Sequence, residues 1–298
     1  MGKLKAGQIT AADLKEYEDS SSDFSFELRM LQRLSLKKWE CEHGGSYTDP
    51  VTGKSRQFDI RAQYFSNRRV FRLAAECKNI RENFPLLIQC VPRLGVEAFH
   101  DIMVAFNRDL IERSKMQLRL RDPFSQCLRI GMARTLYPPG QIVGKSFSQV
   151  GREFQSPNSI TSNNAEVNEK WGQCLASATE LVARSQPSEL PNGMAYLTAI
   201  LPVIVVPNDR LWVSHYDRDG ALIHPPVMSD EITYFVGHTV KPNVLSCLEG
   251  FNFSHIHIVT ETGFRNLRGL IESGEFTERI FPMDSLEQAW RAFLFGRY

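Results

Sequence analysis

Residues 39–80 limit most strongly what this chain can fold into. They contain three runs of alternating or apolar residues, separated by short polar sequences. Asp49-Pro50 opens the first connection, and Gly53 within it tolerates a positive φ. The second connection, at residues 67–68, is short and polar, as hairpin loops are. The stretch therefore predicts three antiparallel strands joined by two tight connections.

The second and third of these strands place two carboxylates on one face. Side chains alternate between the two faces of a strand. The Asp59 side chain is therefore on the other face of its strand from its apolar neighbours, and Glu76 and Lys78 are on the same face of theirs. A hairpin turn centred between Asn67 and Arg68 sets Asp59 directly across from Glu76. Cβ atoms of such a cross-strand pair lie about 4.5–5.5 Å apart.

Two carboxylates at that separation repel each other unless they share a proton or a cation lies between them. Mg²⁺ takes oxygen ligands from one or two carboxylates, water and substrate phosphate. Lys78 adds a positive group that can position a metal-bound water or stabilise developing charge. The hairpin thus predicts metal-assisted hydrolysis of a phosphate ester. The alternative is a solvated charge trio on a half-exposed sheet.

Asp59, followed at hairpin distance by Glu76-Cys77-Lys78 on an apolar strand, resembles the PD-(D/E)XK, or restriction-endonuclease-like, superfamily. The turn sequence of residues 48–54 and the following Phe58-Asp59-Ile60 also resemble stand-alone members of that group. Phe58 stands where the family motif has its proline. The resemblance covers residues 23–80 and 163–207.

The resemblance implies an α/β fold with a core of the order α-β-β-β-α-β. A large insertion would follow the third strand, and an α+β extension would end the chain. We expect a polar amino-terminal segment at residues 1–22 and a nuclease-like core at residues 23–207, with an insertion at about 84–160. A carboxy-terminal extension packed on the core is expected at residues 208–298.

Members of the superfamily are mostly Mg²⁺-dependent nucleases, and the resemblance assigns roles on that basis. Asp59, Glu76 and the Cys77 carbonyl would hold the metal, and Lys78 would handle the attacking water. Glu27, on the expected first helix, would support the metal or its waters. A solvent-facing glutamate favoured by the helix dipole is an equal alternative for Glu27.

The predicted function is that of an endonuclease that hydrolyses phosphodiester bonds, with DNA favoured over RNA as the substrate. The expected cofactor is Mg²⁺, and Mn²⁺ is the expected substitute. The alternative is a catalytically inactive nuclease-like module that binds nucleic acid or a protein partner. A homo-oligomer is left open.

Apolar periodicity predicts further elements outside the hairpin. Residues 24–36, 96–116 and 166–184 are expected to form helices, and 196–206 a central fourth strand. Pro202 in that strand indicates a local break in the ladder or an edge. Lys170 and Gln173 could face the site, but a solvent position is favoured. Other expected elements are strands at 84–92, 127–134, 231–236 and 255–259, a hairpin about 217–220, and helices at 264–273 and 285–295.

Charge and cysteine content add broader limits. The net charge of +1 does not indicate nucleic-acid binding, so any phosphate-binding surface must be local. Six scattered cysteines without a C-x-x-C pair predict reduced thiols in a cytoplasmic protein. The chain has no apolar run of the ~18 residues that span a bilayer and no secretory leader, so no membrane partner is expected. His255 and His257 could be half of a metal site, but a structural pair is favoured.

Overall fold

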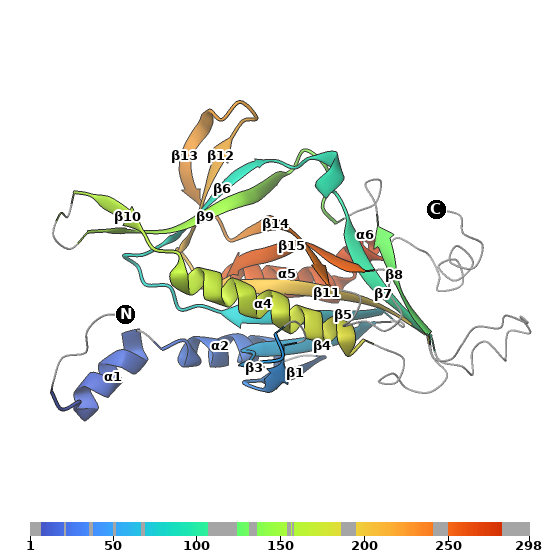
Figure 1. Ribbon diagram of the computed structural model, residues 1–298, viewed down its shortest axis with the longest axis horizontal. Coiled ribbons are helices and arrows are strands. Elements are labelled where there is room, and N and C mark those ends of the chain that lie inside the picture. Colours follow the sequence, from blue (N-terminus) through green and yellow to red (C-terminus); the bar gives the residue numbers. More distant parts are fainter. Residues whose placement is uncertain are drawn as a thin grey trace, which may run out of the picture.

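A large mixed β-sheet forms the centre of the protein in the computed structural model (Figure 1). The structure describes residues 7–20, 22–35, 38–49, 52–66, 69–106, 124–130, 136–153, 156, 158–185, 195–240 and 250–281. Within these ranges thirteen strands belong to the sheet, in the order β1-β4-β5-β11-β15-β14-β9-β6-β12-β13, while β7 pairs with β11 and β8, and β10 with β9.

The strands of the sheet are β1 (Trp39–His43), β4 (Ile60–Ser66), β5 (Arg69–Cys77), β6 (Leu86–Pro92), β7 (His100–Phe106), β8 (Phe124–Ile130), β9 (Ile142–Arg152), β10 (Ile160–Ser162), β11 (Ala195–Val206), β12 (Leu211–Tyr216), β13 (Leu222–Met228), β14 (Glu231–Val240) and β15 (Phe251–Thr260). A separate small sheet pairs β2 (Ser46–Thr48) with β3 (Ser55–Gln57). The edge strand β13 is exposed along its whole length and contains Pro225-Pro226.

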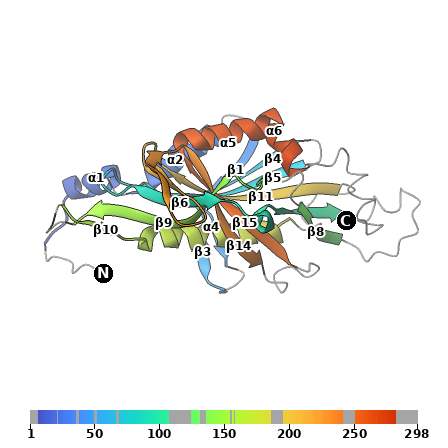
Figure 2. The same ribbon diagram turned by 90° about the horizontal axis from the view of Figure 1, so that it is seen from above.

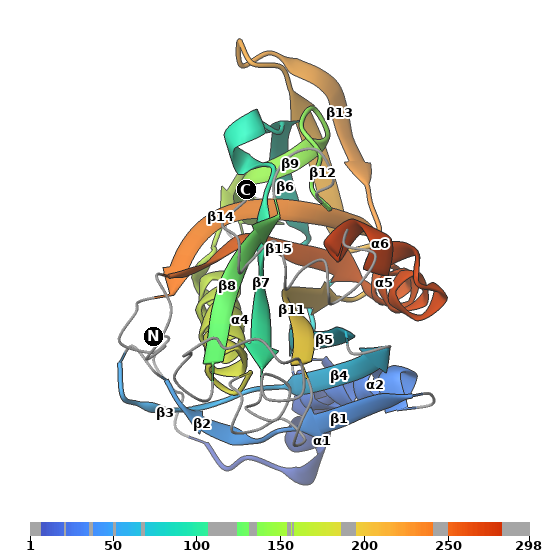
Figure 3. The ribbon, with the colours of Figure 1, turned by 90° about the vertical axis from the view of Figure 1, so that its right-hand side faces the viewer.

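Helices cover both faces of the sheet (Figures 2 and 3). On one face, α2 (Phe24–Ser35), α5 (Glu261–Ser273) and α6 (Glu275–Ile280) share a core with β4, β5 and β11. On the other, α4 (Ala165–Ala183) packs its buried side chains, Cys174 and Ala178 among them, on β5 and β11. The remaining helical segments are α1 (Ala11–Ser20) and the 3₁₀ turn η1 (Gly95–Glu97).

The predicted hairpin register is confirmed. β4 pairs antiparallel with β5 from Ile60 opposite Ala75 to Ser66 opposite Arg69, and β1 pairs with β4. The predicted first strand is divided at Gly44, whose φ is +65°, and the chain leaves the large sheet there to form the β2–β3 hairpin. Burial does not alternate along β5, where every residue from Val70 to Cys77 except Arg72 is buried, because the strand is covered on both faces.

The prediction of a small restriction-endonuclease-like core with a separate insertion and extension is wrong. Strand content exceeds helix content, 46% against 28%. β6 and β9, from the expected insertion, continue the same sheet as β12 to β15 from the expected extension. Hydrogen bonding is continuous from β1 to β13, so these segments complete one sheet and are not appended to a finished core. The domain boundaries at residues 22 and 207 stay a prediction.

The predicted helix at 96–116 is wrong where the structure describes it. After η1, β7 pairs antiparallel with both β11 and β8. Consecutive side chains from Ile102 to Ala105 are all buried, which suits a strand covered on both faces and not an amphipathic helix. The rest of this helix, from residue 107, and the helix expected at 285–295 lie outside the described residues.

Strand β11 is central, as predicted, and its proline lies where the neighbouring strand on one side of β11 changes from β7 to β15. On one side β11 runs parallel to β5 without interruption from Leu197 to Val205. On the other side it pairs with β7 up to Thr198 and with β15 from Val203 onward. Pro202 falls in this gap, so its missing N–H removes no ladder hydrogen bond there.

We expect Gly263→Ala to destabilise the fold and Gly269→Ala, in the same helix, to stabilise it. A Cβ on Gly263 would lie 2.0 Å from the carbonyl oxygen of Asp230, whereas one on Gly269 would meet nothing within 4 Å. The first change should lower the free energy of unfolding by about 1–3 kcal/mol, because the backbone must move. The second should raise it by about 0.5–1 kcal/mol through helix propensity. Urea denaturation measures both, and equal effects would contradict this account of the packing between α5 and β14.

Candidate active site

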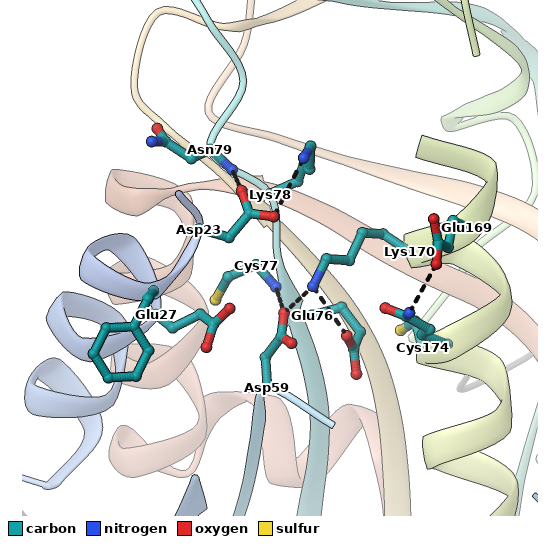
Figure 4. A network of polar contacts seen from close by, with 12 residues as sticks. Asp23, Glu27, Asp59, Glu76, Cys77, Lys78, Asn79, Glu169, Lys170 and Cys174 are labelled. Carbon is teal, nitrogen blue, oxygen red and sulfur yellow. Dashed lines mark hydrogen bonds and ion pairs between the residues drawn. The ribbon is translucent and has the colours of Figure 1, made fainter. Parts of the chain in front are cut away.

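The carboxyl ends of parallel strands meet at one edge of the sheet. β5 and β15 both run parallel to β11, and Cys77 of β5 and Val206 of β11 end their strands at this edge. Asp59 lies at the same edge, immediately before the antiparallel strand β4. The amino-terminal turns of α2 and α4 reach it from the two faces of the sheet (Figure 4). Such edges are where open α/β sheets place their ligands.

Asp59 and Glu76 meet over a cation, which in the structure is the ammonium group of Lys170. The Lys170 Nζ lies 2.6 Å from Asp59 Oδ2 and 3.6 Å from Glu76 Oε2 (Figure 4). Asp59 Oδ2 also accepts a hydrogen bond from the backbone N–H of Cys77 at 2.8 Å. Burial lowers the pKa of Lys170, but the charges of Asp59 and Glu76 outweigh it, so this pKa is raised.

The expectation that Lys170 faces solvent is wrong, since only 14% of its side chain is exposed. The helical spacing contained the missed signal. Position 170 lies three residues after Val167 and four before Cys174, and both are buried. Residues at these offsets share one face of a helix, so Lys170 lies on the stripe that α4 turns to the sheet.

Glu76 is a fully buried carboxylate without a hydrogen-bond partner. Its exposed fraction is 0%, and neither of its oxygens accepts a hydrogen bond within the described structure. Burial, followed by the charge of Asp59, raises the pKa of Glu76 well above its ordinary value, and Lys170 offsets this only in part. The solvated charge trio considered from the sequence is therefore wrong. The buried oxygens favour binding a proton or a cation.

Glu27 lies on the first turn of α2 and reaches toward Asp59 (Figure 4). Its Oε2 lies 3.3 Å from Nε2 of His43, and 14% of the side chain is exposed. Burial and then the charge of Asp59 raise the pKa of Glu27. Glu27 is thus an acid at the margin of the Asp59–Glu76 pair and not a solvent-facing residue.

The placement predicted for Lys78 is wrong. Its Nζ lies 3.2 Å from Asp23 Oδ2 and 3.1 Å from Glu166 Oε2, away from Asp59 and Glu76 (Figure 4). The prediction assumed that the third strand continues through residue 78. Strand β5 instead ends at Cys77, so the alternation of side chains no longer applies to Lys78.

The backbone of Cys77 faces the acid pair. The N–H of Lys78 donates to the Val205 carbonyl, and the N–H of Cys77 donates to Asp59. N–H and C=O of one strand residue point to the same side, so the Cys77 carbonyl also lies on the Asp59 side of β5. The Cys77 thiol is buried, and burial raises its pKa well above the ordinary value.

A cleft of about 600 Å³ opens beside this arrangement. Lys78 lines it together with residues of α1, β9 and α4 and of the segments before α2, between β5 and β6, and before α4: Tyr17, Asp23, Asn79, Arg81, Phe84, Gln149, Asn163 and Glu166. The cleft combines cationic, amide and aromatic side chains.

A scan against protein-family models and searches of the curated proteins and of the solved structures found no match. In the described part of the chain, no group of three or more histidine, cysteine, aspartate or glutamate side chains is arranged to hold a metal ion. No helix among the described residues is long and apolar enough to cross a membrane.

We expect Glu76→Gln to raise the melting temperature of the metal-free protein, and to do so more at higher pH. The folded-state pKa of Glu76 is raised above its ordinary 4.5, so its contribution to stability is complete below that pH. The contribution is lost as the pH rises toward the folded-state pKa, and glutamine removes this loss. Melting curves in EDTA at about pH 5 and about pH 8 measure the difference, with the exposed Glu166→Gln as the control. A gain that does not change with pH would contradict the assignment.

We expect Lys170→Met to destabilise the metal-free protein more than Lys78→Met. Removing one partner of a buried ion pair costs about 3 kcal/mol or more because the other charge stays buried. Both partners of Lys78 are more exposed than Glu76, Asp23 at 19% and Glu166 at 66%, so water reaches them when the lysine is removed. Urea denaturation at about pH 8 compares the two variants. The loss for Lys170→Met should shrink near pH 5, where a proton on Glu76 replaces the missing cation.

Proposed function

We propose that this protein is a metal-dependent nuclease that hydrolyses phosphodiester bonds. The observation that carries the proposal is the fully buried Glu76 carboxylate, which has no hydrogen-bond partner and lies beside Asp59 with a lysine ammonium between them. A site that confines two acids and a lysine in this way suits a reaction in which negative charge accumulates on a phosphate. DNA as the substrate rests on the resemblance of residues 39–80 to the PD-(D/E)XK superfamily.

The donor set fits Mg²⁺, with Mn²⁺ as a substitute. Asp59 and Glu76 offer carboxylate oxygens, and Cys77 offers a carbonyl oxygen on the same side of β5. Mg²⁺ prefers such oxygen ligands and fills its other positions with water and substrate phosphate oxygens, so three protein oxygens are sufficient. A bound divalent ion would lower the pKa of a coordinated water and neutralise charge on the phosphate.

The side chains around the acid pair then take distinct roles. Lys170, the cation closest to both acids, stabilises the charge that develops on the phosphate and orients the attacking water. Glu27, whose raised pKa favours its protonated form, supplies or holds a proton at the margin of the site. Lys78 and Arg81 line the cleft and bind substrate phosphates outside the reacting group.

A second candidate function is that of a non-catalytic module that binds nucleic acid or a protein partner. The observation that favours it is that Lys170 already contacts both Asp59 and Glu76, while Lys78 is engaged by Asp23 and Glu166. In this case the buried charges would serve only the fold. The cytoplasmic location belongs to the same proposal and rests on the scattered cysteines; the five that the structure describes have free thiols.

Cleavage of supercoiled plasmid DNA tests the proposal, with an RNA transcript of the same sequence as the second substrate. We expect cleavage with Mg²⁺ or Mn²⁺ and none in EDTA. Asp59→Asn and Lys170→Met should lower the rate by about 100-fold or more, the size expected when a group acting on the transition state is removed. Lys78→Met is the matched lysine control and should mainly weaken substrate binding.

Two outcomes would contradict the nuclease. The first is cleavage that survives EDTA or is unchanged in Asp59→Asn. The second is the absence of cleavage together with unchanged melting temperature on addition of Mn²⁺, which would favour the non-catalytic module. Because the raised pKa of Glu76 favours a proton that a metal must displace, stabilisation by Mn²⁺ should increase with rising pH and should be lost in Glu76→Gln.

A further inference from the structure

A second cleft lies between the sheet and the helices α5 and α6, and it shares no lining residue with the candidate active site. Its volume is about 370 Å³. Ligand pockets for small molecules commonly have volumes of about 300–1,000 Å³. The wall is part polar and part apolar, and its apolar side chains come from the segment before β9, from β9, β14, α5 and α6: Leu136, Ile142, Ile232, Leu267, Leu270 and Phe276.

A buried arginine lies in the wall of this cleft without an acidic partner. Arg93 is only 1% exposed, and its guanidinium donates from Nε to His255 Nε2 at 3.1 Å. It also donates from Nη1 to the Pro138 carbonyl at 2.9 Å and from Nη2 to Thr233 Oγ1 at 2.7 Å. All three acceptors are neutral. In the part of the chain that the structure describes, Arg93 forms no salt bridge with a carboxylate, and the nearby Glu97 pairs with Lys145.

Together with burial, the charge of Arg93 lowers the pKa of the two nearby histidines, His255 and His257. Burial, followed by the charge of Arg93, lowers the pKa of His255 to about 2 and that of His257 to about 4. Both rings are therefore neutral and add no positive charge. His257 Nε2 is occupied by a hydrogen bond with the Tyr137 hydroxyl at 2.8 Å. Arg93 is thus the buried cation of the cleft, whereas Arg279, the other arginine in its lining, is exposed and pairs with Glu275.

We propose that this cleft binds a small organic anion with a single negative charge, which pairs with Arg93 while its apolar body packs against α5 and α6. Burying a guanidinium without an acidic partner is unfavourable, and a bound anion offsets that cost. Arginine has five N–H donors, so the three bonds to protein leave one N–H on each terminal nitrogen, an arrangement suited to a carboxylate or sulfonate. Glu231 at the exposed margin selects against ligands that carry further negative charge, since the charge of Arg279 there is already paired with Glu275.

The binding of 1-anilinonaphthalene-8-sulfonate to the full chain tests this proposal. The dye joins one sulfonate to an apolar body and fluoresces when it leaves water. N-phenyl-1-naphthylamine has the same apolar body without the charge and is the matched probe. We expect saturable binding of the sulfonate at one site per chain. The neutral probe should bind about tenfold more weakly, as the loss of a charge-assisted hydrogen bond predicts. Octanoate should displace the dye, and inorganic phosphate should not.

Two variants at the half-buried Leu270 keep the test independent of the structural role of Arg93. Leu270→Glu places a negative charge in the cleft and should weaken sulfonate binding by about tenfold or more, whereas the neutral Leu270→Gln should weaken it much less. Arg93→Met should abolish the preference for the charged probe, provided that its melting temperature shows a folded protein. Equal affinity for both probes, or equal effects of the two Leu270 variants, would overturn the proposal. None of these results depends on nuclease activity.

Discussion

The burial of Glu76 is the constraint on which the rest of the site depends. A carboxylate that is fully enclosed by protein is unfavourable in its charged form, and the nearby Asp59 makes it more so. The structure meets this cost with one ammonium group carried by a helix that packs on β5 and β11. The positions of α4, β5 and the start of β4 are therefore linked by electrostatics as well as by apolar packing. Residues that serve only the fold are seldom held at such a cost, which is why the acid pair marks the candidate active site.

The sheet explains how these groups come together. Parallel pairing of β5 with β11 and of β11 with β15 brings three carboxyl ends to one edge. The antiparallel β4–β5 hairpin returns Asp59 to that same edge. Both faces are covered by helices, so side chains at the edge are sheltered on two sides. The charged groups of the site thus lie in a region of low polarity, where each ion pair is stronger than it would be in water.

Local patterns predicted the hairpin well and its surroundings poorly. Alternation and turn chemistry were sufficient to set Ile60 opposite Ala75, because register is a property of one short stretch. Lys170, and not the predicted Lys78, contacts Asp59. This difference depends on where β5 ends and on how α4 packs on the sheet, and the hairpin sequence determines neither.

The continuous sheet escaped prediction for a related reason. β6 and β9 reach β15 only through β14, a strand almost ninety residues further along the chain than β9. Pairings between such distant segments leave no periodic signal in the sequence. The apolar run from Ile102 to Ala105 was mistaken for part of a helix because a short buried strand and a buried helical segment look alike at that length.

The exposed strand β13 has a consequence for how copies of this protein meet. An unpaired strand at the edge of a large sheet offers a row of free N–H and C=O groups to which another chain can add. Here Pro225-Pro226 interrupts that row, since neither residue has an N–H to donate. The prolines thereby disfavour the addition of another strand at this end of the sheet, even though Val227 and Met228 beside them are apolar and exposed.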